Sequence, residues 1–279
     1  ILFGREGTSA EGMVLIGLTG SKNQMGYAGQ LLLLSGLAVL LLRDVAHWTR
    51  WIAALALPIG IYILLGVNSA IALIMGVGGA AMLLVLWFTE PMQPGGRLAA
   101  LIVAIIIATP LLLLIPEGLQ AWDHFLYDTL DKDPTLTGRT ILWDRADDLI
   151  ARRPLLGYGY QAIWMGDSTE TTALKRMFGV LDGRTSHFHH QFRQVAVDTG
   201  LVGLAAFVGA LIAVALNGIR QVLLHPSVPT SFFFVVFAVM TGRSFTDLII
   251  SPINVHMVLF YAACTYAFWK PQEATAPTP

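Results

Sequence analysis

Seven apolar stretches, each near the length of a membrane-spanning helix, constrain this chain more than any other feature. About 20 predominantly apolar residues cross a bilayer as a helix. Of the 279 residues, 55% are hydrophobic and 13% are charged, whereas a soluble domain carries about 25% charged residues. We therefore expect an all-α polytopic membrane protein. The predicted spans are residues 25–42, 51–67, 70–88, 98–115, 200–219, 231–250 and 253–269.

The predicted spans divide the chain into two membrane parts. Residues 1–115 hold four spans and residues 187–270 hold three, while residues 116–186 form one long loop and residues 271–279 a disordered tail. The chain begins in a polar segment with no initiator methionine or signal-peptide pattern, so further N-terminal helices are expected to precede it.

Basic residues in the short loops predict the orientation of the spans. They gather on one face, whereas the opposite short turn, at Asn68, has none. Short loops rich in Lys and Arg stay in the cytoplasm, so we expect the long loop on the outer face. The net charge of −1 gives no bulk attraction to nucleic acid. The basic residues are Arg43, Arg50, Arg97, Arg220 and Lys270.

A cluster of histidines stands at the outer edge of the membrane. Three of the seven histidines fall within four residues, at His187, His189 and His190, and Arg193 follows. If residues 187–199 are helical, His189 and Arg193 share one face. A neutral histidine accepts a proton from a hydroxyl near pH 7, and an arginine stabilises anionic charge. The pair suits the transfer of a hydroxyl nucleophile onto a substrate with an anionic leaving group.

Two other interpretations of the histidines stay open at this point. His187 and His190, three residues apart, offer the spacing of a metal site, although the HExxH motif and clustered carboxylates are absent. Alternatively, the histidines only form hydrogen bonds at the membrane interface.

The long loop contains a predicted amphipathic helix. Apolar residues recur at helical spacing from Thr140 to Arg152, and Pro154 ends the pattern. Arg139, at the N-terminal edge, would bind phosphate together with the free amides of the first turn. From this stretch alone, a solvated interfacial helix is the simpler interpretation.

A glycine-rich turn follows the predicted helix. Gly157 and Gly159 flank Tyr158, and glycine lets a ligand approach the backbone closely.

The sixth predicted span carries a pair of charged residues near its outer end. Arg243 and Asp247 stand four residues apart. Ionisable groups inside a membrane are costly and are usually functional or paired. The two residues either pair with each other, or Arg243 is a second candidate for holding phosphate.

The order of these motifs resembles the O-antigen ligase and O-antigen polymerase superfamily, especially its exopolysaccharide polymerase-like branch. The matching pieces, besides the pair at 243 and 247, are SKNQMG at 21–26, GRTILW at 138–143, RPLLGYGY at 153–160 and SHFHHQFRQVAVDTGLVGL at 186–204.

The resemblance implies a GT-C-like bundle of helices in the bacterial inner membrane. Such a glycosyltransferase needs no metal or other cofactor. It takes a glycan from undecaprenyl pyrophosphate on the periplasmic face and passes it to a hydroxyl of the lipid A core or of a growing polysaccharide. A secondary transporter or flippase of polysaccharide precursors is the alternative. Ionisable residues concentrated at one membrane face favour surface chemistry over transport.

The resemblance also implies the site residues. In the family, ten residues separate the functional histidine from a glycine that opens a span, and His189 and Gly200 have this separation. The family usually has Asn after the histidine, where this chain has His190, so both histidines are candidate bases. Pyrophosphate is expected to contact Arg139, Arg243, Arg193 and Lys22, with support from Asp247, Gly157, Gly159 and Tyr158.

Overall fold

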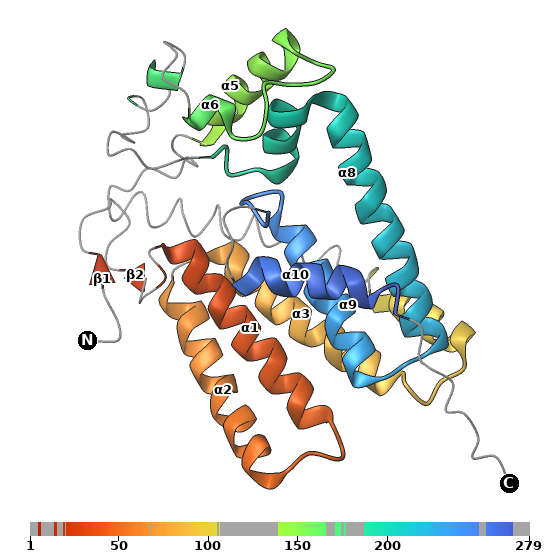
Figure 1. Ribbon diagram of the computed structural model, residues 1–279. Helices are drawn as coiled ribbons and strands as arrows, with labels where there is room; N and C mark the ends of the chain where they lie inside the picture. The colour runs from red at the N-terminus through yellow and green to blue at the C-terminus, as the bar shows by residue number, and fades with distance from the viewer. Residues whose placement is uncertain are drawn as a thin grey trace, which may run out of the picture.

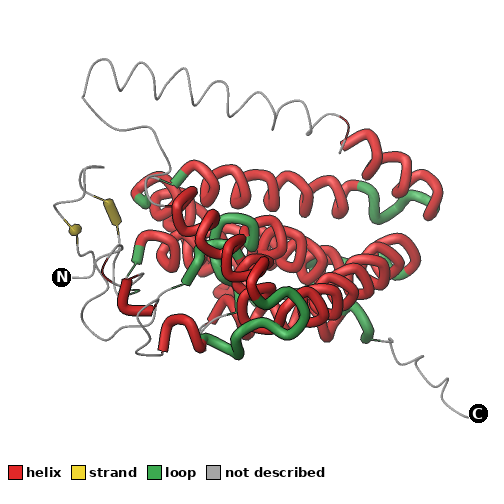
Figure 2. The backbone as a smooth tube through the Cα atoms, turned by 90° about the horizontal axis from the view of Figure 1, so that it is seen from above, coloured by secondary structure: helices red, strands yellow, loops and turns green. Residues whose placement is uncertain are grey.

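The computed structural model describes residues 5–6, 14–15, 19, 21–67, 69–104, 106, 139–165, 171–173, 176, 187–250 and 255–269. Within these ranges the regular secondary structure is helical except for two short strands, β1 (Arg5–Glu6) and β2 (Val14–Leu15), which pair antiparallel. The strands lie beside the N-terminus, at the edge of the bundle (Figure 2). The predicted helical class is therefore confirmed for the membrane part, and the strands are a departure from it.

Three long helices open the bundle: α1 (Lys22–Leu41), α2 (His47–Gly66) and α3 (Ala70–Phe88). Small residues bring them close together. A Cβ atom on Gly60 of α2 would lie 2.9 Å from the backbone nitrogen of Leu33 in α1. A Cβ atom on Gly79 of α3 would lie 2.7 Å from Val239. Such close approach is how helices associate in lipid, where burial of apolar surface contributes little.

Two helices lie within the predicted long loop: α5 (Arg139–Arg152) and α6 (Ala162–Met165). The second half of the bundle follows this loop and consists of α8 (Gln191–Leu224), α9 (Val228–Arg243) and α10 (Val255–Tyr266). Helix α8 runs along one side of the molecule, away from α1 and α2, with α9 and α10 between them (Figure 1). The predicted amphipathic helix is confirmed as α5, which buries Leu142, Ala146 and Leu149.

Four of the described helices, α1, α2, α3 and α8, are long and apolar enough to cross a membrane. Three shorter apolar helices cover Pro94–Ala104, α9 and α10. Each predicted span overlaps one of these helices, which supports a polytopic membrane protein. The count of seven spans stays a prediction.

Two predicted helix boundaries are wrong. The helix expected from His187 begins at Gln191, because the side chain of His190 caps it from an extended backbone. Therefore His189 and Arg193 do not share a helical face. The span expected to reach Ile250 ends at Arg243, so Asp247 lies in a turn after α9.

One end of the bundle holds the described residues of the predicted basic face, which are Arg43, Arg50, Arg97 and Arg220. Lys270 lies outside the described residues. The guanidinium of Arg97 donates hydrogen bonds to the carbonyls of Leu223, near the end of α8, and of Thr89. Arg50 donates to the carbonyls of Leu42 and Arg43, at 3.1 and 2.7 Å. The histidines lie at the other end, where α9 finishes and α1 begins.

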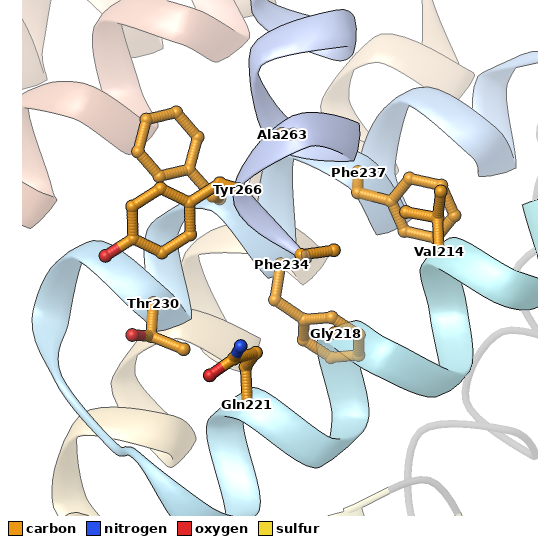
Figure 3. A pocket seen from close by; sticks show the side chains of 10 residues that line it. Val214, Gly218, Gln221, Thr230, Phe234, Phe237, Ala263 and Tyr266 are labelled. Atoms are coloured by element: carbon orange, nitrogen blue, oxygen red, sulfur yellow. The ribbon is translucent and has the colours of Figure 1, made fainter. Parts of the chain in front are cut away.

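An apolar pocket lies between α8, α9 and α10, near the basic end (Figure 3). Its lining is mostly apolar and includes three phenylalanines, while Gln221, Thr230 and Tyr266 carry its polar side-chain groups. Its lining residues include no histidine, carboxylate or basic side chain, so it is not the candidate site.

Candidate active site

Helix α8 is two helical segments joined at a kink. Gly200 has φ 69° and ψ −173°, which breaks the helix. The carbonyls of Val197 and Asp198, left without helical partners at the kink, accept hydrogen bonds from the backbone N–H groups of Tyr158 and Gly159 at 2.9 and 2.8 Å. The loop between α5 and α6 thus caps the first segment of α8.

The kink requires glycine on both sides of this contact. The backbone N–H of Leu201 donates to the carbonyl of Pro154 at 2.6 Å, so the two chains touch backbone to backbone. A Cβ atom on Gly157 would lie 2.5 Å from the Val197 carbonyl oxygen, and one on Gly200 would lie 2.1 Å from the Leu155 carbonyl oxygen. Both glycines also have positive φ, which side-chain-bearing residues rarely adopt.

His190 is the N-cap of α8. Its Nδ1 accepts a hydrogen bond from the backbone N–H of Arg193 at 3.4 Å, so the neutral ring carries its proton on Nε2. The ring packs edge-on against Trp143, Phe192 and Phe245. Burial, followed by the positive charge of Arg193, lowers the pKa of His190 below its ordinary value of 6.5. These contacts indicate that His190 has a structural role, as the cap of α8 and as part of an aromatic cluster.

This capping predicts how stability depends on pH. Because the pKa of His190 is lowered in the folded protein, the unfolded chain binds more protons as the pH falls below 6.5. Stability is therefore full above this pH and decreases as the pH falls toward the folded pKa. We expect His190→Asn, which caps a helix without titrating, to weaken this decrease. Thermal unfolding at a series of pH values measures it, and an unchanged pH profile in the variant would contradict the capping role.

His187 and His189 converge on one carboxylate. His187 Nε2 lies 3.3 Å from Asp247 Oδ1, and His189 Nδ1 lies 3.8 Å from the same atom. The two rings are 4.0 Å apart between centroids. Both histidine side chains are 30% exposed, whereas that of Asp247 is 9% exposed. Nδ1 of His189 is buried, so the exposed part of its ring faces away from the carboxylate.

The backbone of His189 is unusual. Its φ is 50°, a value that few described residues other than glycine share. A left-handed conformation costs about 1–3 kcal/mol and persists where the surroundings impose it, often at functional sites. Here the cap at His190 follows, and Phe188 on the other side is held by hydrogen bonds from Trp143 Nε1 to its carbonyl and from its N–H to Gln194.

Gln191 fixes the turn that carries Asp247. Its backbone N–H donates to the carbonyl of Ser244 at 2.8 Å, and its side-chain oxygen accepts from the N–H groups of Ile249 and Ile250 at 3.0 and 2.9 Å. The residue is 2% exposed. One buried side chain therefore sets the distance between the start of α8 and the carboxylate.

Arg243 is buried beneath the histidine cluster. Its Nη1 donates to Gln30 Oε1 at 2.9 Å, and its guanidinium lies 3.7 Å from the centroid of the Tyr27 ring. The other face of Tyr27 is occupied by His256, whose ring is stacked at 4.2 Å. Gln30 in turn donates to the Ala72 carbonyl at 2.8 Å. This network places a positive charge between α1, α9 and α10, close to Asp247.

The cluster also has the donor set of a metal site. The candidate ligand atoms of His187, His189 and Asp247 all lie within 4.8 Å of one another. The metal interpretation of the sequence paired His187 with His190 instead, and His190 is engaged as a cap. Arg243, which interacts electrostatically with Asp247, already provides positive charge at this carboxylate.

The other predicted phosphate ligands lie in different places. Arg193 forms a bidentate ion pair with Asp147 of α5, in which Nε and Nη2 donate to the two carboxylate oxygens at 2.9 and 3.0 Å. Its guanidinium also lies 5.0 Å from the centroid of the Trp143 ring. Lys22 is the first residue of α1. Arg139 begins α5, but its side chain lies outside the described part. The structure thus brings together His189, Asp247 and Arg243 from the predicted set.

Arg193 has a testable structural role. If it acts by holding α5 against α8, Arg193→Ala and Asp147→Ala should lower stability by similar amounts, and the double variant should be little worse than either. The pair is partly exposed, at 29% and 52%, so the expected coupling energy is about 0.2–1 kcal/mol. A double-mutant cycle on thermal unfolding measures it. A large loss of activity with Arg193→Ala alone would instead favour a substrate contact.

Several residues of the cluster escaped the sequence interpretation. The sequence predicts a role for His187 only in the metal alternative, and it predicts none for Gln30 or Gln191. A glutamine and a tyrosine within one turn of each other in an apolar span, as at Gln30 and Tyr27, are a signal of a buried polar network. Nothing in the spacing indicates that Gln191 would bind the turn after α9.

Residues 53–208 match the profile of a protein family described as O-antigen ligase, and this match covers more than half of the chain. The chain belongs to the O-antigen ligase family. The match covers α2, α3, α5, the histidine segment and the kink of α8. The exopolysaccharide production protein ExoQ of Rhizobium meliloti (strain 1021) is 27% identical over 251 residues, which is 88% of this chain and 57% of ExoQ. The chain thus spans little more than half the length of that relative.

Membership in the O-antigen ligase family fits the geometry. The matched range includes His187 and His189, while Asp247 and Arg243 lie beyond it. The similarity to ExoQ extends over most of the chain and supports the predicted exopolysaccharide branch. The protein is therefore a membrane protein of the O-antigen ligase family.

Proposed function

We propose that this protein is an inner-membrane glycosyltransferase that moves a glycan from undecaprenyl pyrophosphate to a sugar hydroxyl on the periplasmic face. The observation that carries the proposal is the convergence of His187 and His189 on Asp247 at one end of the helical bundle. A histidine oriented by a carboxylate is the arrangement that activates hydroxyl nucleophiles.

His189 is the base in this proposal. Its Nδ1 faces Asp247, which leaves Nε2 for the acceptor hydroxyl. His187 has the reverse orientation, since its Nε2 faces the carboxylate. In the transfer step, the acceptor oxygen attacks the anomeric carbon as its proton passes to His189. The bond from that carbon to the pyrophosphate oxygen breaks, and undecaprenyl pyrophosphate leaves with the bonding electrons. Attack opposite the leaving group inverts the anomeric centre.

Positive charge stabilises the departing pyrophosphate. Arg243 is 1% exposed, so it contributes charge from below the site rather than as a mobile ligand. Arg139, at the first residue of α5, is the proposed direct contact, with Lys22 at the start of α1 as a further cation. The reaction is proposed to need no metal, because these groups supply the charge.

The role of Arg243 is measurable. We expect Arg243→Gln to lower the transfer rate at least about tenfold, which corresponds to about 1.4 kcal/mol of transition-state stabilisation, and Arg243→Lys to recover part of it. The matched control is Arg220→Gln, at the basic end of α8, which should leave the rate unchanged. Melting temperatures of all three variants separate loss of charge from loss of fold. Equal rates for Arg243→Gln and Arg220→Gln would contradict the assignment.

Polymerase activity is the favoured form of the reaction. The relative ExoQ is named for exopolysaccharide production, and Ala70 stands after Ser69 where many ligases have arginine. Glycan analysis of a deletion strain distinguishes the two. Loss of chain length indicates a polymerase, and full-length polymer that is left unattached indicates a ligase.

A further inference from the structure

We propose that the loop Pro154–Tyr160 lies in the membrane interface, with Leu155 and Leu156 inserted among lipid acyl chains. These side chains are 66% and 76% exposed. Their backbone is nevertheless fixed, because the loop is hydrogen-bonded to the kink of α8 on both sides of Gly200. Large apolar side chains held outward on a fixed loop mark an interaction surface.

The exposed leucines continue the exposed apolar face of α8. The N–H of Val202 donates to the carbonyl of Leu155 at 3.4 Å, so the loop lies directly beside the first residues after the kink. Leu201 and Val202 are 47% and 58% exposed. Farther along α8, which is long and apolar enough to cross a membrane, Leu216 is 63% exposed. The exposed residues of α8 from Leu201 to Leu216 include no polar side chain, so the apolar surface extends from α8 into the loop.

The margin of this surface has the composition of a membrane interface. Arg152 and Arg153, both exposed, precede the leucines, and Arg153 lies 4.7 Å from the ring centroid of Tyr158. Arginine side chains reach lipid phosphates while their stems stay in apolar surroundings. Tyr160, 65% exposed, is of the type enriched at the level of the headgroups. The partner proposed is therefore the bilayer itself, in the leaflet on the side of the histidines.

This anchoring has a consequence for the site. The same loop binds the carbonyls of Val197 and Asp198 at the end of the first segment of α8. That segment begins at the histidines. Fixing the loop at the depth of the headgroups therefore fixes the histidine cluster at the depth where the phosphates of a lipid-linked substrate lie. The anchoring itself does not depend on which reaction the site performs.

Fluorescence quenching by lipids tests the proposal. The sole cysteine is first replaced by Cys264→Ser, and a bimane label is attached to Leu156→Cys in the protein reconstituted in phosphatidylethanolamine and phosphatidylglycerol vesicles. Labels at Leu216→Cys and Asp148→Cys are the lipid-facing and water-facing controls, because Leu216 lies within α8 and Asp148 is 59% exposed on α5. The quenchers are lipids brominated on the acyl chain and aqueous iodide.

We expect brominated lipid to quench the label at position 156 several-fold more than the label at 148, and to approach the quenching at 216. Quenching at 156 no greater than at 148 overturns the proposal. In that case, strong quenching by iodide shows that the loop stands in water. Protection from both quenchers shows that another protein surface covers it.

Discussion

Replacing His189 by alanine is expected to lower the rate of glycan transfer about 100- to 10,000-fold, the contribution typical of a general base. The variant should still insert and fold, because the side chain is 30% exposed and its Nδ1 has only a 3.8 Å contact to Asp247. The measurement is the initial rate of product formation with a lipid-linked glycan donor, at equal amounts of inserted protein.

The neighbouring histidine supplies a matched control. His190→Asn keeps a side chain that caps helices well and restores the residue that the family usually has at this position. We expect it to retain most of the activity, whereas His190→Ala should lose about 1 kcal/mol of stability with the cap. If His190→Asn is inactive while His189→Ala is active, the assignment of the two histidines is reversed.

Replacing Gly200 by alanine is expected to cost at least about 3 kcal/mol and to deplete folded protein. Its φ and ψ of 69° and −173° fall in a region that essentially only glycine occupies. In addition, the new Cβ atom would lie 2.1 Å from the carbonyl oxygen of Leu155, so the loop and α8 would have to separate. The yield of monodisperse protein and its melting temperature in detergent measure the effect.

Gly209 provides the comparison within the same helix. A Cβ atom there meets nothing within 4 Å, and alanine in a helix interior is favoured over glycine by up to about 1 kcal/mol. We expect Gly209→Ala to melt at the wild-type temperature or slightly above it. Equal melting temperatures for the two alanine variants would show that the backbone contact between loop and kink is absent in the folded protein.

The long helices were predictable because the length of an apolar stretch indicates whether it can cross a membrane as a helix. The apolar positions that predicted α5 likewise include its buried residues Leu142, Ala146 and Leu149, although Ile141, which belongs to the same pattern, is 49% exposed. Helix ends were less predictable, because they depend on contacts between distant segments. The end of α9 at Arg243 precedes a turn that Gln191 binds, some fifty residues earlier in the chain.

The structure brings together His189, Asp247 and Arg243 from the predicted residues, but in an arrangement that the sequence did not predict. The resemblance to the family selected His189 and His190, and the cost of burying charge selected Arg243 and Asp247. Their relation is different from the one expected, since His189 faces Asp247 and Arg193 pairs with Asp147. A turn, a cap and a kink create this arrangement, and none of the three has a periodic signature in the sequence.

The most direct test of the central claim is the stoichiometry of the reaction in vesicles. The protein is reconstituted with an undecaprenyl-pyrophosphate-linked glycan in buffer containing EDTA, and released undecaprenyl pyrophosphate is counted against new glycosidic bonds. The account predicts one molecule released for each bond formed, with an inverted anomeric centre. Movement of the intact lipid-linked glycan across the membrane with no new bond would contradict it and indicate a transporter.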